Sequence, residues 1–133
     1  MCLSNFTKKI YKRNKACYKI QIVINGINNW VSMIEHTPLP IGRIVADGKK
    51  DIKVNSINGG FFHSFEYESD AYAEIHNSRL EVDYSCRIIK CFIPANLEVY
   101  KGEGLRSNGF ASREIINTDK VVYLSLLKIK KEK

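Results

Sequence analysis

Two stretches of the chain carry side chains that could do chemistry, and the more promising is a basic, glycine-rich loop at residues 101–109 (KGEGLRSNG). Lys101 and Arg106 lie in it, and Ser112 and Arg113 follow it. Flexible glycines can present backbone N–H groups to an anion, and the cations add charge. No Gly-Lys-Ser/Thr closes the loop, and no clear strand and helix bracket a dinucleotide fingerprint. We therefore predict an anion-binding loop, with an ordinary hairpin connection as the alternative.

The second stretch is residues 58–65 (NGGFFHSF), where two glycines lead into three aromatic residues around a histidine. Neighbouring residues of a strand point to opposite faces, so His63 and Ser64 cannot act as a base and nucleophile pair. We predict no catalytic residue here. His63 either lines the wall of the anion site or is a structural histidine that hydrogen-bonds backbone. The rings available to stack on a ligand are those of Phe61, Phe62 and Tyr100.

The cysteines and histidines do not form a metal site. A zinc site needs ligands at chelating spacings, and this chain has no C-x-x-C pair and only three scattered histidines. We predict no metal and no cofactor, and we interpret the thiols as buried small hydrophobic groups. If residues 87–93 form a strand, Cys91 shares a face with Ile89 and Ile93, whereas Cys86 lies on the opposite face.

The net charge of +7 favours an anionic partner, either a small molecule or an acidic protein. Much of this charge lies near the two ends of the chain, where solvated termini explain it equally well. Nucleic acid is the weaker candidate, because few aromatic residues interleave with the basic ones. No apolar run is long enough for a membrane span, and the N-terminus lacks the apolar core of a signal peptide. We therefore expect a cytoplasmic protein with no membrane partner.

Hydrophobic alternation predicts a sheet-rich domain. Residues 17–25 (CYKIQIVIN) alternate as a half-buried strand does, and residues 87–93 (RIIKCFI) indicate a core strand that Pro94 stops. Residues 110–116 fit neither period cleanly. Residues 1–16 read as a basic, weakly structured leader before a single domain at residues 17–133. Further strands are expected at residues 30–35, 43–46, 97–100 and 120–129.

One helix stands out, at residues 69–79 (SDAYAEIHNSR). Ser69 or Asp70 is expected to cap it, because a short side-chain oxygen accepts from the free N–H groups of the first turn. Its expected apolar stripe is Ala71, Tyr72 and Ile75. We predict an α+β fold with a mostly antiparallel sheet of six or seven short strands and one main helix.

The order of short motifs resembles a family of small uncharacterised proteins of gut Bacteroidetes and their phages. The shared elements are residues 1–3 (MCL), 17–19 (CYK), 60–65 (GFFHSF), 89–94 (IKCFIP), 100–102 (YKG) and 110–112 (FAS). This chain departs from that pattern by a second Phe in the Gly-Phe-His element and by a longer glycine-rich loop. The resemblance implies a phage-encoded protein in the host cell cytoplasm. It implies no chemistry, since the family has no assigned activity.

Together these observations favour a non-enzymatic binding or accessory protein that holds an anionic ligand, such as a nucleotide or a signalling molecule. The predicted ligand-binding residues are Lys101, Arg106, Ser112, Arg113, Phe61, Phe62, His63 and Tyr100. One alternative is an enzyme with an ADP-ribosyltransferase-like fold, in which Glu114 would supply the acidic group. Another is a protein–protein interaction module, dimeric through the edge of its sheet.

Overall fold

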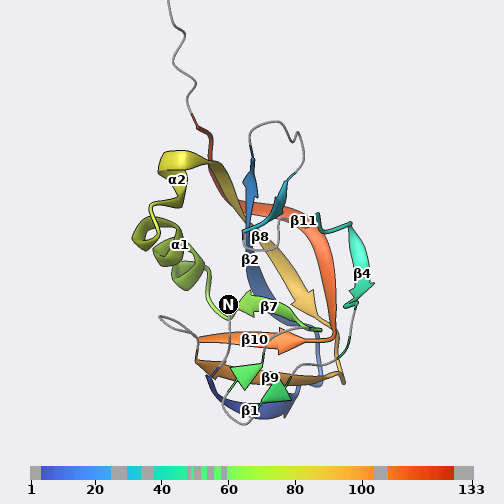
Figure 1. Cartoon of the computed structure of the whole chain (residues 1–133). Helices are drawn as coiled ribbons and strands as arrows, with labels where there is room; N and C mark the ends of the chain where they lie inside the picture. Colours follow the sequence, from blue (N-terminus) through green and yellow to red (C-terminus); the bar gives the residue numbers. More distant parts are fainter. Residues whose placement is uncertain are drawn as a thin grey trace, which may run out of the picture.

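The computed structural model describes residues 4–24, 30–33, 38–47, 49, 52–53, 56–57, 60–103 and 108–127. Most of these residues belong to one antiparallel sheet of nine strands, shown in Figure 1 with two short helices beside it. The strands are β1 (Ser4–Ile10), β2 (Lys15–Val23), β3 (Val31–Ser32), β4 (Gly42–Val45), β5 (Ile52–Lys53), β6 (Ser56–Ile57), β7 (Phe62–Phe65), β8 (Ser85–Ile93), β9 (Glu98–Glu103), β10 (Asn108–Ser112) and β11 (Glu114–Ser125). The helices are α1 (Glu68–Asn77) and α2 (Leu80–Asp83).

The strand order in the sheet is β1-β9-β10-β7-β2-β8-β11-β4, with β3 paired to β2. Among the described residues, β5 and β6 form a separate two-stranded sheet. β7 joins two halves whose strands are oriented differently, since β9 and β10 run across the lower part of Figure 1 while the antiparallel pair β2 and β8 runs steeply through its upper part. The link is narrow, because Tyr18 opposite Phe65 is the only β2–β7 pair in the register.

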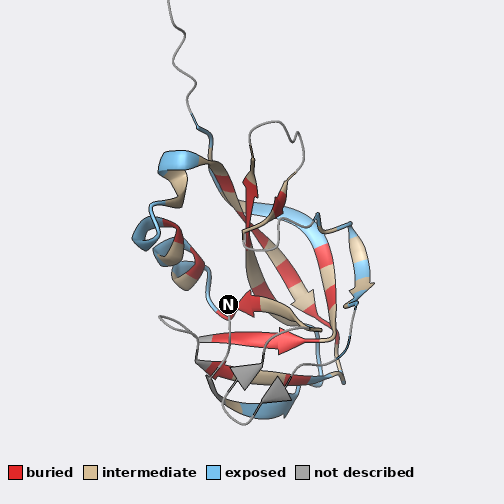
Figure 2. Ribbon diagram, in the orientation of Figure 1, coloured by how far each residue is buried: buried red, intermediate tan, exposed pale blue. Residues whose placement is uncertain are grey.

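The sheet has two sides that alternate residue by residue along each strand. The inner side buries one core cluster from both halves of the sheet, with Cys17, Ile89 and Cys91 from the upper strands and Val99 and Phe110 from the lower ones. The outer side carries Ile20, Ile22, Cys86 and Ile88, on which α1 packs with Ala71 and Ile75. Figure 2 shows this two-sided burial as red segments on β8 and β10.

Several sequence predictions hold. The sheet is mostly antiparallel, and strands lie at the expected places near residues 43–46 and 87–93. Cys91 lies with Ile89 and Ile93 in one cluster, and Cys86 lies in the other, as alternation required. The predicted count of six or seven strands was too low, because β1 lies in the segment predicted as a leader and β10 begins in the segment predicted as a loop.

Other predictions were wrong. The expected leader contains β1, which pairs along β9 from Ser4 to Ile10. The expected loop at 101–109 is partly strand, because β9 continues to Glu103 and β10 begins at Asn108. Gly109 lies opposite Gly102 in this hairpin, so both glycines serve strand pairing.

The helix prediction was right in place and wrong in detail. Tyr67 holds the N-cap position of α1 and no side chain caps it. The acidic groups of its first turn, Glu68 and Asp70, favourably face the helix dipole instead. Tyr72 is not part of a buried stripe, since it is 43% exposed. α2 was not expected at all.

Candidate aromatic face

The lower half of the sheet brings side chains from four strands into one row on its outer side. Lys8 of β1 lies opposite Tyr100 of β9, Tyr100 lies opposite Ala111 of β10, and Ala111 lies opposite His63 of β7. Residues directly opposite in an antiparallel pair share a face, so these four side chains form one line across the sheet. We call this surface and its contacts the aromatic face: Phe6, Lys8, Phe61, His63, Tyr100, Ala111 and Arg113.

Three aromatic rings meet over Ala111, which is fully buried beneath them. The ring of Tyr100 makes edge-to-face contacts with Phe6 at 5.5 Å and with Phe61 at 5.7 Å between centroids. Such pairs stabilise by about 0.5–1.5 kcal/mol beyond the area they bury. The rings themselves are only half-buried. They therefore keep surface that a ligand can contact.

Two cations lie over these rings. The Nζ of Lys8 is 5.9 Å from the Tyr100 ring centroid, and the guanidinium carbon of Arg113 is 6.0 Å from that of Phe61. Both distances fall within the range of cation–π attraction. Lys8 also pairs with Glu98 at 3.2 Å, and the hydrogen bond to that carboxylate raises the pKa of Lys8. The aromatic face thus combines half-buried rings with positive charge.

Backbone contacts hold the turn that delivers Phe61 and His63. Arg113 donates from Nη1 to the carbonyl of Gly60, whose φ of 78° is one that glycine adopts at little cost. Lys19 reaches from β2 and donates from Nζ to the carbonyl of His63 at 2.7 Å. Two basic side chains therefore bind backbone carbonyls of this segment, one at Gly60 and one at His63.

The structure brings together four of the eight predicted binding residues. Phe61, His63, Tyr100 and Arg113 all belong to the aromatic face. Arg106 lies outside the described residues. The remaining three, Phe62, Lys101 and Ser112, lie on the inner side of the same strands.

Strand alternation explains why the predicted site divides. Lys101 is opposite Phe110, whose side chain is fully buried in the inner core, and Ser112 is opposite Phe62 and fully buried itself. A loop would have allowed all these groups to converge. A strand sends successive side chains to opposite faces, so they cannot reach one ligand together.

Lys101 already has a partner. Its Nζ contacts Glu66 at 3.0 Å, where the Lys101 side chain is 34% exposed and that of Glu66 only 5%. The hydrogen bond to Glu66 raises the pKa of Lys101. Since Glu66 is a buried acid, the ammonium of Lys101 neutralises it and is committed to the fold.

Sequence reasoning missed three members of the aromatic face, Phe6, Lys8 and Ala111. Phe6 and Lys8 fall within residues 1–16, which were predicted to be a weakly structured leader. The available signal was weak. Residues 6–10 (FTKKI) place Phe6, Lys8 and Ile10 at period two, but two adjacent lysines obscure the alternation.

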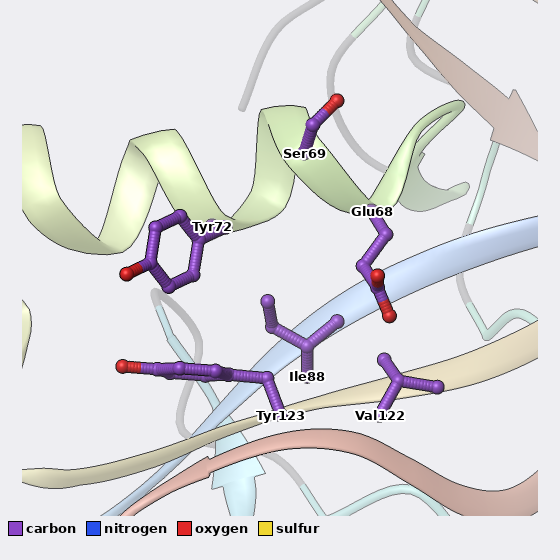
Figure 3. Close-up of a pocket in the computed structure, with 6 residues that line it drawn as sticks. All are labelled: Glu68, Ser69, Tyr72, Ile88, Val122 and Tyr123. Atoms are coloured by element: carbon purple, nitrogen blue, oxygen red, sulfur yellow. The ribbon is translucent and has the colours of Figure 1, made fainter.

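A separate shallow hollow of about 190 Å³ lies between α1 and the sheet (Figure 3). Its lining consists of Glu68, Ser69, Tyr72, Ile88, Val122 and Tyr123. Figure 3 shows the two tyrosine rings at one end and the Glu68 carboxylate at the other. The lining includes an acid and no lysine or arginine, so the hollow does not suit an anion. None of the predicted site residues lines it.

Next to this hollow, Glu81 joins two titratable groups. It accepts a hydrogen bond from the Tyr123 hydroxyl at 3.2 Å and lies 3.0 Å from Nδ1 of His76. Burial is the main cause that raises the pKa of Tyr123, and the Glu81 hydrogen bond adds to it.

The described residues can also be compared with the metal site and the enzyme site considered in the sequence analysis. Within it, no group of three or more His, Cys, Asp or Glu side chains is arranged to hold a metal ion. Glu114, the acid of the enzyme alternative, pairs with Arg43 at 2.7 Å. Neither α1 nor α2 has the length and apolar character needed to cross a membrane.

Comparison with known proteins adds no relative. No protein-family model matches the chain, and searches of curated proteins and of solved structures find no similar chain. The resemblance to Bacteroidetes and phage proteins therefore stays a prediction from short motifs. The proposed function therefore depends on the geometry of the aromatic face.

Proposed function

We propose that the protein is a non-enzymatic binding protein whose aromatic face holds an anionic ligand with an aromatic ring, such as a nucleotide. The observation that carries this proposal is the row Lys8–Tyr100–Ala111–His63, with Phe61 and Arg113 beside it. Half-buried rings in contact with one another and two cations lie there on one surface.

A nucleotide has chemical groups that match both the aromatic rings and the cations of this surface. Its base can stack on aromatic side chains, which contributes about 1–3 kcal/mol per base in single-strand binding proteins. Its phosphates can accept charge-assisted hydrogen bonds from Lys8 and Arg113. The net charge of +7 adds a long-range attraction for such a ligand.

The ligand chemistry can be separated by titration calorimetry with three compounds. ATP carries base and phosphates, adenosine carries the base alone, and pyrophosphate carries the charge alone. We expect ATP to bind with a Kd between about 10 μM and 1 mM and to bind at least about tenfold more tightly than the other two. No heat with ATP or with the GTP, CTP and UTP controls would contradict the proposal, as would equal affinity for pyrophosphate.

A matched pair of variants tests the placement of the site. Lys8→Gln and Lys9→Gln remove the same charge from adjacent positions, but Lys9 lies opposite Val99 of the inner core rather than Tyr100. We expect Lys8→Gln to weaken ATP binding about threefold to tenfold, as one lost charge-assisted hydrogen bond would. Lys9→Gln should change it less than twofold. Equal losses would indicate non-specific attraction to net charge.

A further inference from the structure

Two of the buried cysteines face each other directly across the centre of the sheet. Cys17 of β2 lies opposite Cys91 of β8 in an antiparallel register that runs without interruption over nine residue pairs. Opposite residues of such a pair have Cα atoms roughly 4.5 or 5.5 Å apart, depending on the hydrogen-bonding position. Both separations lie within the range of about 4.4–6.8 Å that a disulfide spans.

The side chains also share one environment. Cys17 and Cys91 belong to the same inner core cluster, and each has no exposed surface. Their sulfurs are close enough for the charge of one thiolate to raise the pKa of the other thiol.

The third described cysteine is a built-in comparison. Cys86 is also fully buried on β8, but it lies opposite Ile22 and packs in the outer cluster under α1. Burial alone is therefore common to all three thiols. Direct opposition to a second thiol belongs only to Cys17 and Cys91 among the residues that the structure describes.

We propose that Cys17 and Cys91 are a redox-modification site, which a hydroperoxide converts into an intramolecular disulfide that links β2 to β8. The Cys17 sulfur attacks one peroxide oxygen and the O–O bond breaks. The other oxygen takes up the thiol proton and leaves as water from hydrogen peroxide, or as an alcohol from an organic hydroperoxide, and Cys17 becomes a sulfenic acid. The Cys91 sulfur then attacks the Cys17 sulfur, the S–O bond breaks, and water leaves. The two thiols lose two electrons and two protons, and the peroxide gains them.

The rate of this reaction depends on the pKa values of the two thiols, which burial raises and a nearby positive charge lowers. Burial raises the pKa of Cys17 to about 11 and that of Cys91 to about 12, so thiolate is scarce at neutral pH. Lys19, which lies next to them on β2, favours both thiolates and partly opposes burial. We therefore expect slow oxidation, over hours rather than seconds.

The bond should stabilise the folded chain. It closes a loop over residues 18–90, and long loops lose the most unfolded-state entropy when they are closed. A rise in Tm on the order of 10 °C is expected if the native geometry accepts the bond without strain.

Peptide mass spectrometry tests the proposal on the full chain. Folded protein is exposed to hydrogen peroxide, blocked with N-ethylmaleimide in denaturant, and digested with trypsin. Cys17 and Cys91 fall in peptides 16–19 and 91–101, and Cys86 falls in peptide 80–87. We expect peptides 16–19 and 91–101 to be joined, with a mass lower by two hydrogen atoms, while peptide 80–87 remains alkylated.

Three variants define the outcome. Cys17→Ser and Cys91→Ser should each abolish the joined peptide, and Cys86→Ser should leave it unchanged. Circular dichroism shows whether each variant is folded, and Cys17→Ala and Cys91→Ala replace any serine variant that is not. Full alkylation of Cys17 and Cys91 after a day with peroxide would overturn the proposal. So would cross-links distributed among all the cysteines, or a lower Tm for the cross-linked protein.

Discussion

The outer side of the sheet contains two regions that are built from similar strands and covered differently. In the upper region, α1 packs on Ile20, Ile22 and Ile88, and these side chains are buried aliphatic groups. In the lower region, the aromatic face, the side chains that bury Ala111 come from Phe6, Phe61 and Tyr100. The aliphatic surface depends on a helix to exclude water, whereas the aromatic face covers itself with large rings.

This difference indicates different uses. A helix-covered surface stabilises the fold, because its apolar area is removed from water on folding. A self-covered surface keeps part of each ring exposed and places Lys8 and Arg113 beside the rings. The proposal of a ligand site therefore concerns the lower region and assigns the upper region a structural role.

The largest expected effect would come from the helix-covered region. Ile88→Ala should lower the free energy of unfolding by about 3–4 kcal/mol, because it leaves a cavity under α1 where the side chain is fully buried. Urea unfolding monitored by circular dichroism measures this change. ATP affinity of the folded variant should be unaltered, and a parallel loss of binding would break the comparison.

Tyr100→Ala should have the opposite pattern, with a small loss of stability and a large loss of ATP affinity. Because the ring is only half-buried, we expect a loss of about 1–2 kcal/mol in stability. ATP affinity should fall about tenfold, as removal of one stacking ring does. Calorimetry and urea unfolding on the same samples give both numbers. A stability loss as large as that of Ile88→Ala, with binding intact, would make the aromatic face a second core.

Lys101 sharpens the comparison between the two sides of the lower strands. Lys101→Met should cost about 1–2 kcal/mol near pH 7, less than a fully buried pair, since a third of the lysine side chain is exposed. The folded-state pKa of Lys101 is raised above its ordinary 10.5 by Glu66. This contribution is therefore fully present below pH 10.5 and is lost as pH rises through the higher folded-state value.

Urea midpoints of wild type and Lys101→Met between pH 8 and pH 11.5 test this sign, with the pH scale chosen to span roughly one unit above the ordinary lysine pKa. The two curves should converge at the alkaline end. ATP binding at pH 7 should change less than twofold, apart from the general effect of one lost charge. A tenfold loss would return Lys101 to the ligand site.

The smallest effect is expected at Glu98, which pairs with Lys8 at 3.2 Å where both side chains are more than half exposed. Glu98→Gln should leave the urea midpoint unchanged within error, since exposed pairs contribute little. It should strengthen ATP binding about twofold, because it releases Lys8 from a competing carboxylate. Weaker binding would indicate that Glu98 contacts the ligand.

The sequence predicted the sheet where alternation is strong and failed where strands are short or joined. Residues 87–93 contain three isoleucines and end before Pro94, so β8 and the opposite faces of Cys86 and Cys91 could be predicted. β11 begins two residues after β10 ends and contains two register shifts, so no single period describes residues 110–125. A prediction by periodicity loses such strands.

Only four of the eight predicted binding residues come together on the aromatic face, and the reason is related. Glycines near Lys101 favoured a loop, and a loop would have gathered every neighbouring cation. Pairing of Gly102 with Gly109 made the segment a hairpin and placed Lys101 on the inner side. Lys8 and Phe6 could not be placed, because only the long-range pairing of β1 with β9 brings them to Tyr100. Local sequence does not contain that pairing.

The central claim is that ligand binding occurs on the aromatic face, and an ATP titration followed by amide and aromatic chemical shifts tests it most directly. We predict the largest changes at Lys8, His63, Tyr100 and Ala111, which form one row across four strands. The chemical shifts of Ile75 in α1 and of Ile88 beneath it should not change. Changes confined to the hollow between Glu68 and Tyr123, or no changes at millimolar ATP, would contradict the account.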